Sequence, residues 1–391
     1  MTPRSRPRRS RALTMNKWMT LQIGGAEEKR MERRGWMIVA IVICLIVNSS
    51  GRELKVEVKH THHHRHHHHM ATYNHTLARI LVEYASAVYL SDLTELFTWT
   101  CSRCNHLTKG FEIIDLIIDV KRCLQAFVGV AKDLNAIVIA FRGTQESSIQ
   151  NWVEDLYWKQ LDIDYPGIDN AMVHHGFYSA YYNTTLQPGV VNAVEKAMDL
   201  YGKIDIIVTG HSMGGAIAGF CGLDLSLALG EQNVQVMTFG QPRIGNAAFA
   251  SYYSQVVPNT IRVTNGHDIV PHLPPYYHYF PQKTYHHFPR EVWLYSIGFG
   301  SFSYAVEKVC DNSGEDPTCS RSVAGNSIPD HMTYYGVQMG CETSGTCKII
   351  MDPRISAFVR KDLDGNLVLS RVPFAPDLKL ITELADQGSA L

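Results

Sequence analysis

Short apolar runs and segments of helical periodicity alternate along the middle of the chain. Four of the runs are rich in β-branched residues and lead into turns, as buried strands do. They are residues 136–141, 204–209, 234–239 and 260–264. Helical patterns fill several of the intervals, for example residues 190–201 and 216–229. This order predicts an α/β fold with a mainly parallel sheet, helices on both faces and functional groups at the carboxyl ends of the strands.

The length and composition fit one large α/β domain or two average ones. The chain has 391 residues, of which 45% are hydrophobic and 19% are charged, so it can bury a substantial core and is not a wholly disordered protein. The sequence contains no repeat with a period of about 20–50 residues, which excludes solenoids and propellers. We expect the folded domain to span residues 71–358 and a peripheral tail to follow at 359–391.

The N-terminal region carries two segments of unusual composition. The longest apolar run, residues 36–47, follows several Lys and Arg residues and is shorter than the roughly 20 residues that cross a bilayer. With the small residues after it, this run predicts an N-terminal extension and secretory signal over 1–51, while an uncleaved anchor or a buried segment stays an alternative. Residues 52–70 are rich in histidine and are expected to form a solvated linker, with loose metal binding or an added tag as alternatives.

The charge balance argues against a function in nucleic-acid binding. The chain has 36 Lys and Arg residues against 37 Asp and Glu residues, a formal net charge of −1. Residues 1–35 hold ten of the basic and only three of the acidic side chains, so the remainder of the chain is acidic. A protein that binds nucleic acid through bulk electrostatics needs a basic surface, and we therefore expect no such partner.

Cysteine usage is consistent with an exported protein. Eight cysteines lie outside the apolar run, and in a secreted chain such cysteines are expected to form disulfide bonds. Cys221 falls within a predicted buried helix and is the expected free thiol. A zinc site at Cys101 and Cys104 with His106 is a weaker alternative, because no second ligand pair has metal-site spacing.

Two glycosylation sequons point to the same compartment. They are Asn74-His75-Thr76 and Asn183-Thr184-Thr185, and each would accept a glycan if the chain enters the secretory route. Together with the signal and the cysteines, they predict a secreted, extracellular glycoprotein with disulfide bonds.

The strongest chemical signal is the sequence Gly210-His211-Ser212-Met213-Gly214, which follows a predicted strand and begins a predicted helix. In this setting the pattern Gly-x-Ser-x-Gly marks a nucleophilic serine. A sharp strand-to-helix turn lifts the serine hydroxyl clear of the sheet, and the following peptide N–H groups can face a developing oxyanion. A glycine-rich turn with an incidental serine is the alternative.

A nucleophilic serine needs a histidine that accepts its proton and a carboxylate that orients the histidine. Asp268 follows a predicted strand and His331 lies downstream, so the order Ser212, Asp268, His331 is that of α/β-hydrolases. Position alone leaves other candidates for the two roles. They are Asp311, Asp316 and Asp330 for the acid, and His272, His278, His286 and His287 for the base.

Five segments carry recognisable motifs. They are Phe-Arg-Gly-Thr at 141–144, Ser-Ile-Gln-Asn-Trp-Val-Glu-Asp-Leu at 148–156, Val-His-His-Gly-Phe at 173–177, Gly-His-Ser-Met-Gly-Gly-Ala at 210–216 and Phe-Gly-Gln-Pro-Arg-Ile-Gly at 239–245. In this order they resemble class 3 lipases, the fungal triacylglycerol-lipase-like family, and especially its secreted plant members. The resemblance covers about residues 75–355 and implies an α/β-hydrolase fold. It also implies that Ser212 is the nucleophile, Asp268 its acid and His331 its base.

The same resemblance locates an oxyanion hole. It implies that the backbone N–H groups of Thr144 and Met213 hold the negatively charged oxygen of the intermediate. The histidines of the third motif, His174 and His175, are expected to be structural. This chemistry requires no metal and no organic cofactor.

Residues 148–156 resemble the lid helix that covers the pocket in these lipases. Ile149, Trp152, Val153 and Leu156 recur at helical spacing and form one apolar stripe. A short amphipathic helix can cover an apolar cleft in water and move aside at a lipid surface. A helix that simply faces the core has the same pattern and is the alternative.

The sequence thus predicts a serine carboxylic ester hydrolase that releases fatty acids from acylglycerols, that is, a triacylglycerol lipase. A phospholipase A1 or galactolipase would share every motif, and so would a cell-wall feruloyl or acetyl esterase. A non-catalytic interaction module on the same fold is the alternative from a different class. The expected partner is a lipid substrate or a lipid–water interface, with no obligate protein partner.

Overall fold

The computed structural model describes residues 72–145, 148–158, 161–230, 233–277, 284–299, 302–341 and 349–372. The chain divides into two units, residues 1–66 and 67–391, and every described residue belongs to the second unit. The expected signal over 1–51 and the histidine-rich linker over 52–70 lie outside the described residues. None of the helices described is long and apolar enough to span a membrane.

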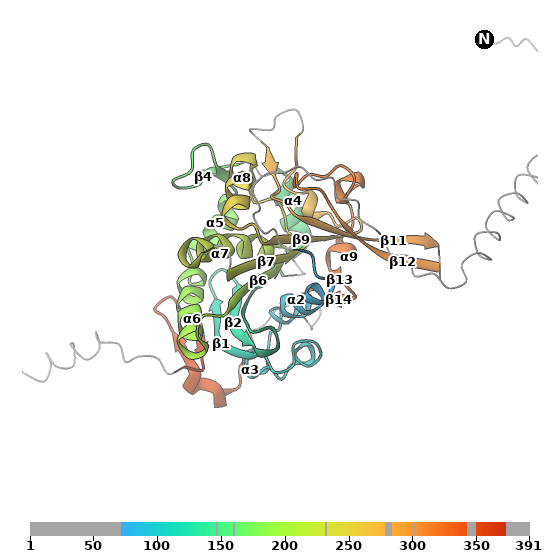
Figure 1. Cartoon of the computed structure of the whole chain (residues 1–391). Helices are drawn as coiled ribbons and strands as arrows, with labels where there is room; N and C mark the ends of the chain where they lie inside the picture. The colour runs from blue at the N-terminus through green and yellow to red at the C-terminus, as the bar shows by residue number, and fades with distance from the viewer. Residues whose placement is uncertain are drawn as a thin grey trace, which may run out of the picture. The chain divides into compact units, whose positions relative to one another are not determined.

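A ten-stranded sheet forms the centre of the second unit (Figure 1), with the strand order β12-β11-β9-β7-β6-β3-β2-β1-β16-β15. The strands are β1 (Glu112–Asp119), β2 (Leu124–Ala131), β3 (Ala136–Phe141), β6 (Asp205–His211), β7 (Val234–Phe239), β9 (Thr260–Asn265), β11 (Glu291–Phe299), β12 (Phe302–Val309), β15 (Val359–Lys361) and β16 (Leu367–Ser370). The five strands from β3 to β11 run parallel, and the strands outside them pair antiparallel. The four predicted strands are β3, β6, β7 and β9, so the parallel centre is confirmed.

Helices cover both faces of the sheet, as predicted. One face packs against α4 (Ile149–Trp158), α5 (His175–Tyr182), α6 (Leu186–Tyr201), α7 (Met213–Leu229) and α8 (Ala247–Val256), and the other against α2 (His75–Ala87) and α3 (Leu93–Thr98). Figure 1 shows α6 and α7 on one side of the strands and α2 and α3 on the other. Adjacent strand residues alternate between the two apolar cores: Val208 belongs to the α7 side and Ile207 to the α2 side.

The sheet continues past the predicted end of the domain. The predicted boundary at residue 358 is too early, because β16 pairs with β1 and lies inside the sheet. Leu369 is opposite Leu116, and both side chains are fully buried. The segment that was expected to be a peripheral tail therefore supplies part of the core. A strand of four residues is too short for its alternation to stand out in the sequence.

Short elements connect the long strands and helices and complete the fold. They are β4 (Ile163–Asp164), β5 (Met172–Val173), β8 (Gly245–Asn246), β10 (Tyr285–His286), β13 (Thr333–Tyr334), β14 (Val337–Gln338), α9 (Ile328–His331) and the 3-10 turns η1 (Ser102–Cys104), η2 (Lys132–Leu134), η5 (Val270–His272), η6 (Ser320–Ser322) and η7 (Pro353–Phe358). Strands β4, β5, β8 and β10 form a second small sheet, and β13 pairs with β14.

Disulfide bonds join Cys101 to Cys104 and Cys310 to Cys319. The first bond excludes the zinc alternative, because it leaves no thiolate pair at that position. Cys221 is buried and free, as predicted, and Cys123 is exposed and free. Disulfides persist in oxidising compartments, so these bonds fit an exported protein.

Candidate active site

Ser212 occupies a sharp turn between β6 and α7. Its backbone lies at φ 59° and ψ −130°, a conformation that a non-glycine residue adopts only under strain. Its N–H donates to Phe239 O at 2.9 Å, which ties the turn to the end of β7. The flanking glycines touch across the turn, since a Cβ on Gly210 would lie 2.4 Å from the carbonyl of Gly214. The Gly-x-Ser-x-Gly pattern is thus a steric requirement of this turn.

His331 and Asp268 form a buried pair. His331 Nδ1 lies 2.9 Å from Asp268 Oδ2, and the two residues are 0% and 2% exposed. The other carboxylate oxygen accepts a hydrogen bond from the N–H of Val270 at 2.8 Å. A carboxylate at Nδ1 holds the proton on that nitrogen and leaves Nε2 as the acceptor. The structure therefore brings together the acid and the base that the sequence predicted.

Ser212 and this pair lie at the same edge of the sheet, since Ser212 directly follows β6 and Asp268 follows β9, which runs parallel to it. The ring of His211, the residue before Ser212, lies 4.4 Å from the ring of His331. Ser212 is completely buried, and within the described residues neither its Oγ nor His331 Nε2 has a hydrogen-bond partner. Buried polar atoms are rarely left without a partner. Ser212 Oγ and His331 Nε2 are therefore both available to form a hydrogen bond with each other or with a reacting group. Hydrogen bonds of this kind often shorten only when substrate is bound.

The competing acids and bases have other contacts. Asp330 accepts a hydrogen bond from the N–H of His267 at 2.7 Å, and Asp316 accepts one from the N–H of Asp311 at 2.9 Å. The ring of His272 contacts backbone carbonyls, including that of Asp268 at 2.9 Å. His287 Nε2 lies 2.8 Å from the carbonyl of Pro271, His286 Nδ1 lies 2.6 Å from that of His287, and His278 lies outside the described residues.

Tyr334 is a third partner of the carboxylate that the sequence reasoning missed. Its hydroxyl donates to the same Asp268 oxygen that faces His331. Burial, followed by the charge of Asp268, raises the pKa of Tyr334 well above its ordinary value, so the phenol stays protonated as a donor. The only available signal was its position three residues after the histidine.

A second group that the sequence reasoning missed, Tyr89, links the loop after β3 to the side chain of His211, the residue before Ser212. The Tyr89 hydroxyl accepts from the N–H of Gly143 at 3.1 Å and lies 2.8 Å from His211 Nδ1. His211 Nε2 lies 2.8 Å from the carbonyl of His331 and donates to it, which leaves Nδ1 to accept from Tyr89. Burial is the main cause that lowers the pKa of His211 well below its ordinary value, so the ring is neutral.

The expected oxyanion-hole residues are neighbours. Thr144 follows β3, and its hydroxyl points to the sulfur of Met213 at 3.9 Å. Arg142 anchors the loop, because its buried guanidinium donates to Gln125 Oε1 at 3.2 Å and to the carbonyl of Cys123. The arginine of the Phe-Arg-Gly-Thr motif therefore has a structural role beside the site.

Helix α4 packs its predicted apolar stripe inward. Ile149, Val153 and Leu156 are buried in the core on the α7 side, and Trp152 is half-buried with its ring 6.2 Å from that of Phe177. Trp158 at the end of the helix is 80% exposed. Both a lid and an ordinary core-facing helix have this arrangement.

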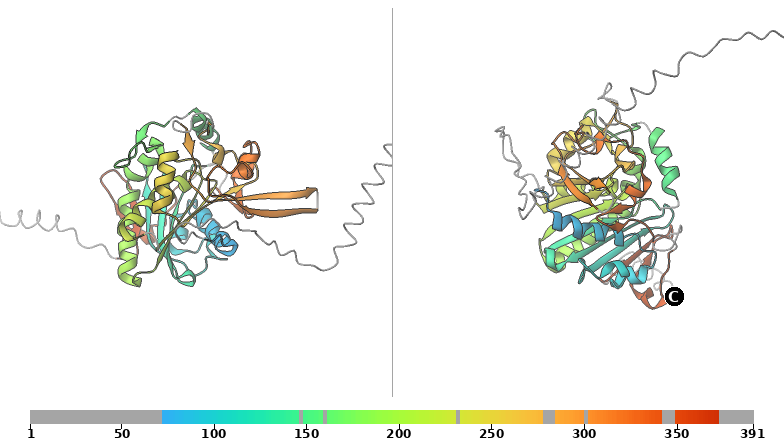
Figure 2. Two further views of the ribbon diagram at one scale, coloured as in Figure 1. Left: turned by 45° about the horizontal axis from the view of Figure 1, so that its top comes forward. Right: turned by 90° about the vertical axis from the view of Figure 1, so that its right-hand side faces the viewer.

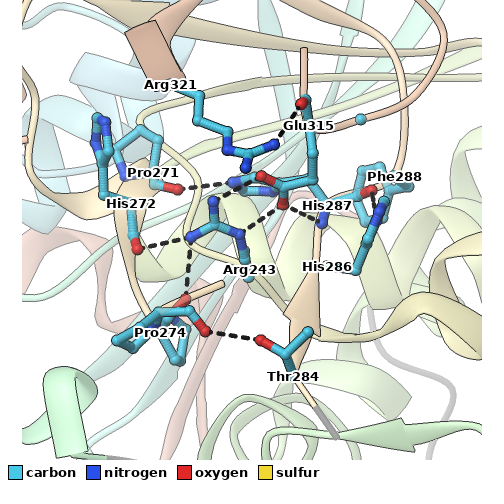
Figure 3. A network of polar contacts seen from close by, with 12 residues as sticks. Arg243, Pro271, His272, Pro274, Thr284, His286, His287, Phe288, Glu315 and Arg321 are labelled. Carbon is cyan, nitrogen blue, oxygen red and sulfur yellow. Dashed lines mark hydrogen bonds and ion pairs between the residues drawn. The ribbon is translucent and has the colours of Figure 1, made fainter. Parts of the chain in front are cut away.

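A buried ion pair fixes the loops near Asp268 (Figure 3). Arg243 meets Glu315 through two contacts, Nε to Oε1 at 2.6 Å and Nη2 to Oε2 at 2.8 Å. Its Nη1 donates to the carbonyls of His272 and Pro274, at 2.6 Å and 3.0 Å. Burial alone would raise the pKa of Glu315, but Arg243 lowers it, so the pair is ionised. The arginine of the Gln-Pro-Arg-Ile-Gly motif thus holds together loops that follow β7, β9 and β12.

Possible metal ligands occur together once in the described part of the chain. Cys310, Asp316 and Cys319 lie within 4.8 Å of one another, but the two cysteines form a disulfide bond. This group is therefore unsuited to a thiolate-bound metal.

Comparison with protein families and curated proteins gives one consistent relationship. The sequence model of the family "Lipase (class 3)" matches residues 138–278. A lipase from Rhizomucor miehei is 34% identical over 247 residues, which are 62% of this chain and 63% of that protein, slightly less than two thirds of its length. Lipase ZK262.3 from Caenorhabditis elegans is 30% identical over 319 residues, or 71% of this chain and 85% of that protein.

Solved structures agree with the sequence comparison. A triacylglycerol lipase whose catalytic centre is formed by a serine protease triad matches with a TM-score of 0.58 and 32% identity, over 70% of this chain and 96% of that one. The similarity therefore covers nearly the whole of that lipase, including an α/β-hydrolase sheet.

Proposed function

Because the chain belongs to the class 3 lipase family, we propose that it hydrolyses the ester bonds of acylglycerols and releases fatty acids. One observation carries the proposal. The hydroxyl of a strained, buried serine and the free nitrogen of a carboxylate-bound histidine lie in the same site, and both lack a partner among the described residues. This arrangement is that of an activated serine nucleophile.

The proposed reaction uses Ser212 as nucleophile. His331 Nε2 takes the serine proton as Oγ attacks the ester carbonyl, and Asp268 stabilises the imidazolium that forms. The N–H groups of Thr144 and Met213 are proposed to hold the oxyanion. His331 then protonates the departing alcohol. In the second half of the reaction water attacks the acyl-enzyme, with His331 again accepting a proton and then returning it to Ser212. Every proton transfer in this scheme is carried out by side chains of the chain itself.

Helix α4 is the proposed lid. Ser212 has no exposed surface, so an ester can reach it only after part of the structure moves. The apolar stripe of α4 packs into the core on the α7 side, and the hydroxyl of Thr144, five residues before the helix, lies 3.9 Å from the sulfur of Met213, the residue after Ser212. At a lipid surface the stripe would exchange one apolar environment for another, so opening costs least there.

We further propose that the chain acts outside the cell. The disulfide bonds fit an oxidising compartment, and Asn74 and Asn183 are both exposed, as glycan acceptors must be. Asn74 also caps α2, since its side chain accepts from the N–H of Leu77 at 3.1 Å.

The test is acyl release by the full chain from four emulsified or soluble esters: triacylglycerol, phosphatidylcholine, galactolipid and a feruloyl ester. We expect the highest rate with triacylglycerol. A Ser212→Ala variant should lose a factor on the order of 10⁶ in kcat, as triad knockouts do. A higher rate on phospholipid or galactolipid would reassign the substrate. Activity of Ser212→Ala within tenfold of the parent would refute the mechanism itself.

A further inference from the structure

The hairpin formed by β11 and β12 extends beyond the rest of the sheet. The pairing of β11 with β9 ends at Leu294 and Asn265, while β11 and β12 remain paired as far as Phe299 and Phe302. Five residues of β11, 295–299, thus continue past the end of β9, a reach of roughly 17 Å at about 3.3 Å per residue. Figure 1 and the left view of Figure 2 show this arm projecting from the fold.

The arm projects outward from the edge of the sheet that holds the candidate active site. β11 runs parallel to β9, so its far end lies beyond the carboxyl end of β9. Asp268 follows that end by three residues, and Ser212 lies at the carboxyl end of β6 in the same parallel set. The hairpin and Ser212 therefore lie at the same edge of the sheet.

One face of the projecting hairpin is apolar. The register places Ile297 opposite Tyr304 and Tyr295 opposite Val306, so these four side chains share a face. The opposite face carries Ser296 paired with Ala305. The sequence from 295 to 306 contains no charged residue.

Nothing among the described residues covers the distal part of this apolar face. Ile297 is 52% exposed and Tyr304 is 67% exposed, whereas Tyr295, nearer the sheet, stacks on Trp293 with ring centres 4.3 Å apart. Trp293 belongs to a small core with the Cys310–Cys319 disulfide. The apolar face thus begins in a packed core and continues into solvent.

Several bonds hold the base of the hairpin to the body. Glu307 accepts a hydrogen bond from the hydroxyl of Tyr73 at 2.8 Å, and Lys308 Nζ donates to Thr318 Oγ1 at 2.8 Å. Trp293 Nε1 donates to the carbonyl of Gly266 at 3.1 Å. The arm therefore has a fixed base and a free, apolar end.

We infer that the β11–β12 hairpin is a lipid-docking arm that inserts its apolar face, with Ile297 and Tyr304, into the surface of the substrate phase. This inference rests on the proposed function. Amphipathic elements insert about 5–10 Å into a lipid surface, and the arm is longer than that. Tyrosine suits the boundary, because its ring is apolar and its hydroxyl stays hydrated. Docking on this side would hold the carboxyl edge of the sheet against the lipid.

The test compares binding of full-length variants to triolein droplets coated with phosphatidylcholine, in a Ser212→Ala background that leaves the lipid intact. I297S/Y304S should bind roughly tenfold more weakly, which corresponds to about 1.4 kcal/mol. The matched control Ala305→Ser, on the opposite face, should bind as the Ser212→Ala parent does. Unchanged binding of I297S/Y304S would overturn the inference, as would a parent that does not bind the droplets. If the double variant loses its cooperative thermal unfolding, Tyr304→Ser alone replaces it.

Two further measurements separate the inference from its rivals. With Ser212 intact, I297S/Y304S should hydrolyse a soluble short-chain ester at the parent rate, since the arm lies outside the site. A parent that is inactive on every ester but binds droplets through the hairpin would refute the proposed function and leave the docking arm supported. A lipid-free parent dimer that I297S/Y304S converts to monomer would instead identify the face as a contact between copies and overturn lipid docking.

Discussion

Gly240 leaves the space that Asp268 and His331, the proposed catalytic acid and base, occupy. It adopts φ +57°, and a Cβ there would lie 2.9 Å from each of Asp268 Oδ2, His331 Nδ1 and the Tyr334 hydroxyl. No side chain fits without moving these three groups. The residue directly follows the carbonyl that anchors Ser212, so the geometry of the whole site depends on the absence of one methyl group.

Gly240→Ala should lower kcat on a soluble ester by about 10²-fold, because a displacement of about 1 Å at a catalytic group can cost that much. The control is Gly167→Ala, which has a similar positive φ of +80° but open space around it. That variant carries the same kind of backbone penalty and should keep its rate. A normal rate for Gly240→Ala would show that the triad tolerates the intrusion.

Tyr334→Phe removes a hydrogen-bond donor from a buried carboxylate. We expect kcat to fall by roughly tenfold and the free energy of unfolding to fall by about 1–3 kcal/mol, the usual cost of leaving a buried polar group short of a partner. Ester hydrolysis and urea unfolding measure the two effects. The neighbour Tyr335→Phe serves as control, because its hydroxyl contacts Tyr73 and not the site. Equal kinetics for the two variants would contradict a role for Tyr334 in positioning Asp268.

The sequence predicted residues whose chemistry is carried by local motifs, and it missed those that act across the fold. Ser212 lies within a recognisable motif and Asp268 follows a predicted strand, whereas His331 was assigned from its place in the chain order and from the family resemblance. Tyr89 contributes through a contact with His211, 122 residues away, and nothing in its local sequence indicates this. Arg243 was part of a recognised motif, but its partner Glu315 lies 72 residues downstream.

At the scale of elements, α4 combines a buried stripe with a polar outer face. Val153 is 6% exposed within the stripe, and Gln150 on the outer face is exposed. A charged side chain at Val153 must leave the core or find a partner of opposite charge, because burying an unpaired charge is costly. A charged side chain at Gln150 stays in water. The helix therefore offers a matched pair of substitutions.

Val153→Asp should favour the displaced position of α4. We expect the variant to hydrolyse dissolved short-chain ester faster than the parent does. The further rise in rate when the ester exceeds its solubility limit should be roughly tenfold smaller than in the parent. Gln150→Glu adds the same charge to the exposed face and should behave as the parent. If both variants retain the parental increase at the solubility limit, α4 is an ordinary core-facing helix and not a lid.

The predicted elements were those with strong local periodicity. Strands β3, β6, β7 and β9 are short, buried on both faces and separated by helices, so their apolar runs stand out. The antiparallel strands were not among the predicted runs. β2 and β12 pair with strands next to them in the chain, whereas β16 joins β1 across about 250 residues, a pairing that no local pattern indicates. The position of β16 next to β1 in the sheet is therefore set by contacts between distant segments and could not be predicted from its local sequence.

At the scale of the whole molecule, two buried histidines connect stability to pH. Burial is the largest cause that lowers the pKa of His211 and of His287 well below the ordinary value. In the unfolded chain each would titrate near pH 6.5. The unfolded state therefore binds protons below that pH that the folded state does not, and stability is lost as the pH falls.

Thermal unfolding should show this loss between about pH 7.5 and 5.5, with a slope of up to about 1.4 kcal/mol per pH unit for each histidine. His287→Gln should make the dependence less steep, whatever its effect on stability at pH 7.5. The exposed His106 provides the control substitution, His106→Gln, which should leave the slope unchanged. An identical slope in all three proteins would show that His287 does not link folding to proton binding.

The position of β16 has a consequence for how the chain is made. This strand is synthesised after all the others in the sheet, yet it lies between β1 and β15. Residues up to Ser370 must therefore emerge from the ribosome before β16 can pair with β1 and complete the sheet. Until then β1 has an open edge, the kind of surface to which other chains add in aggregation. A premature stop codon a few residues after 358 would make that temporary state permanent, although Ser212, Asp268 and His331 had already been translated.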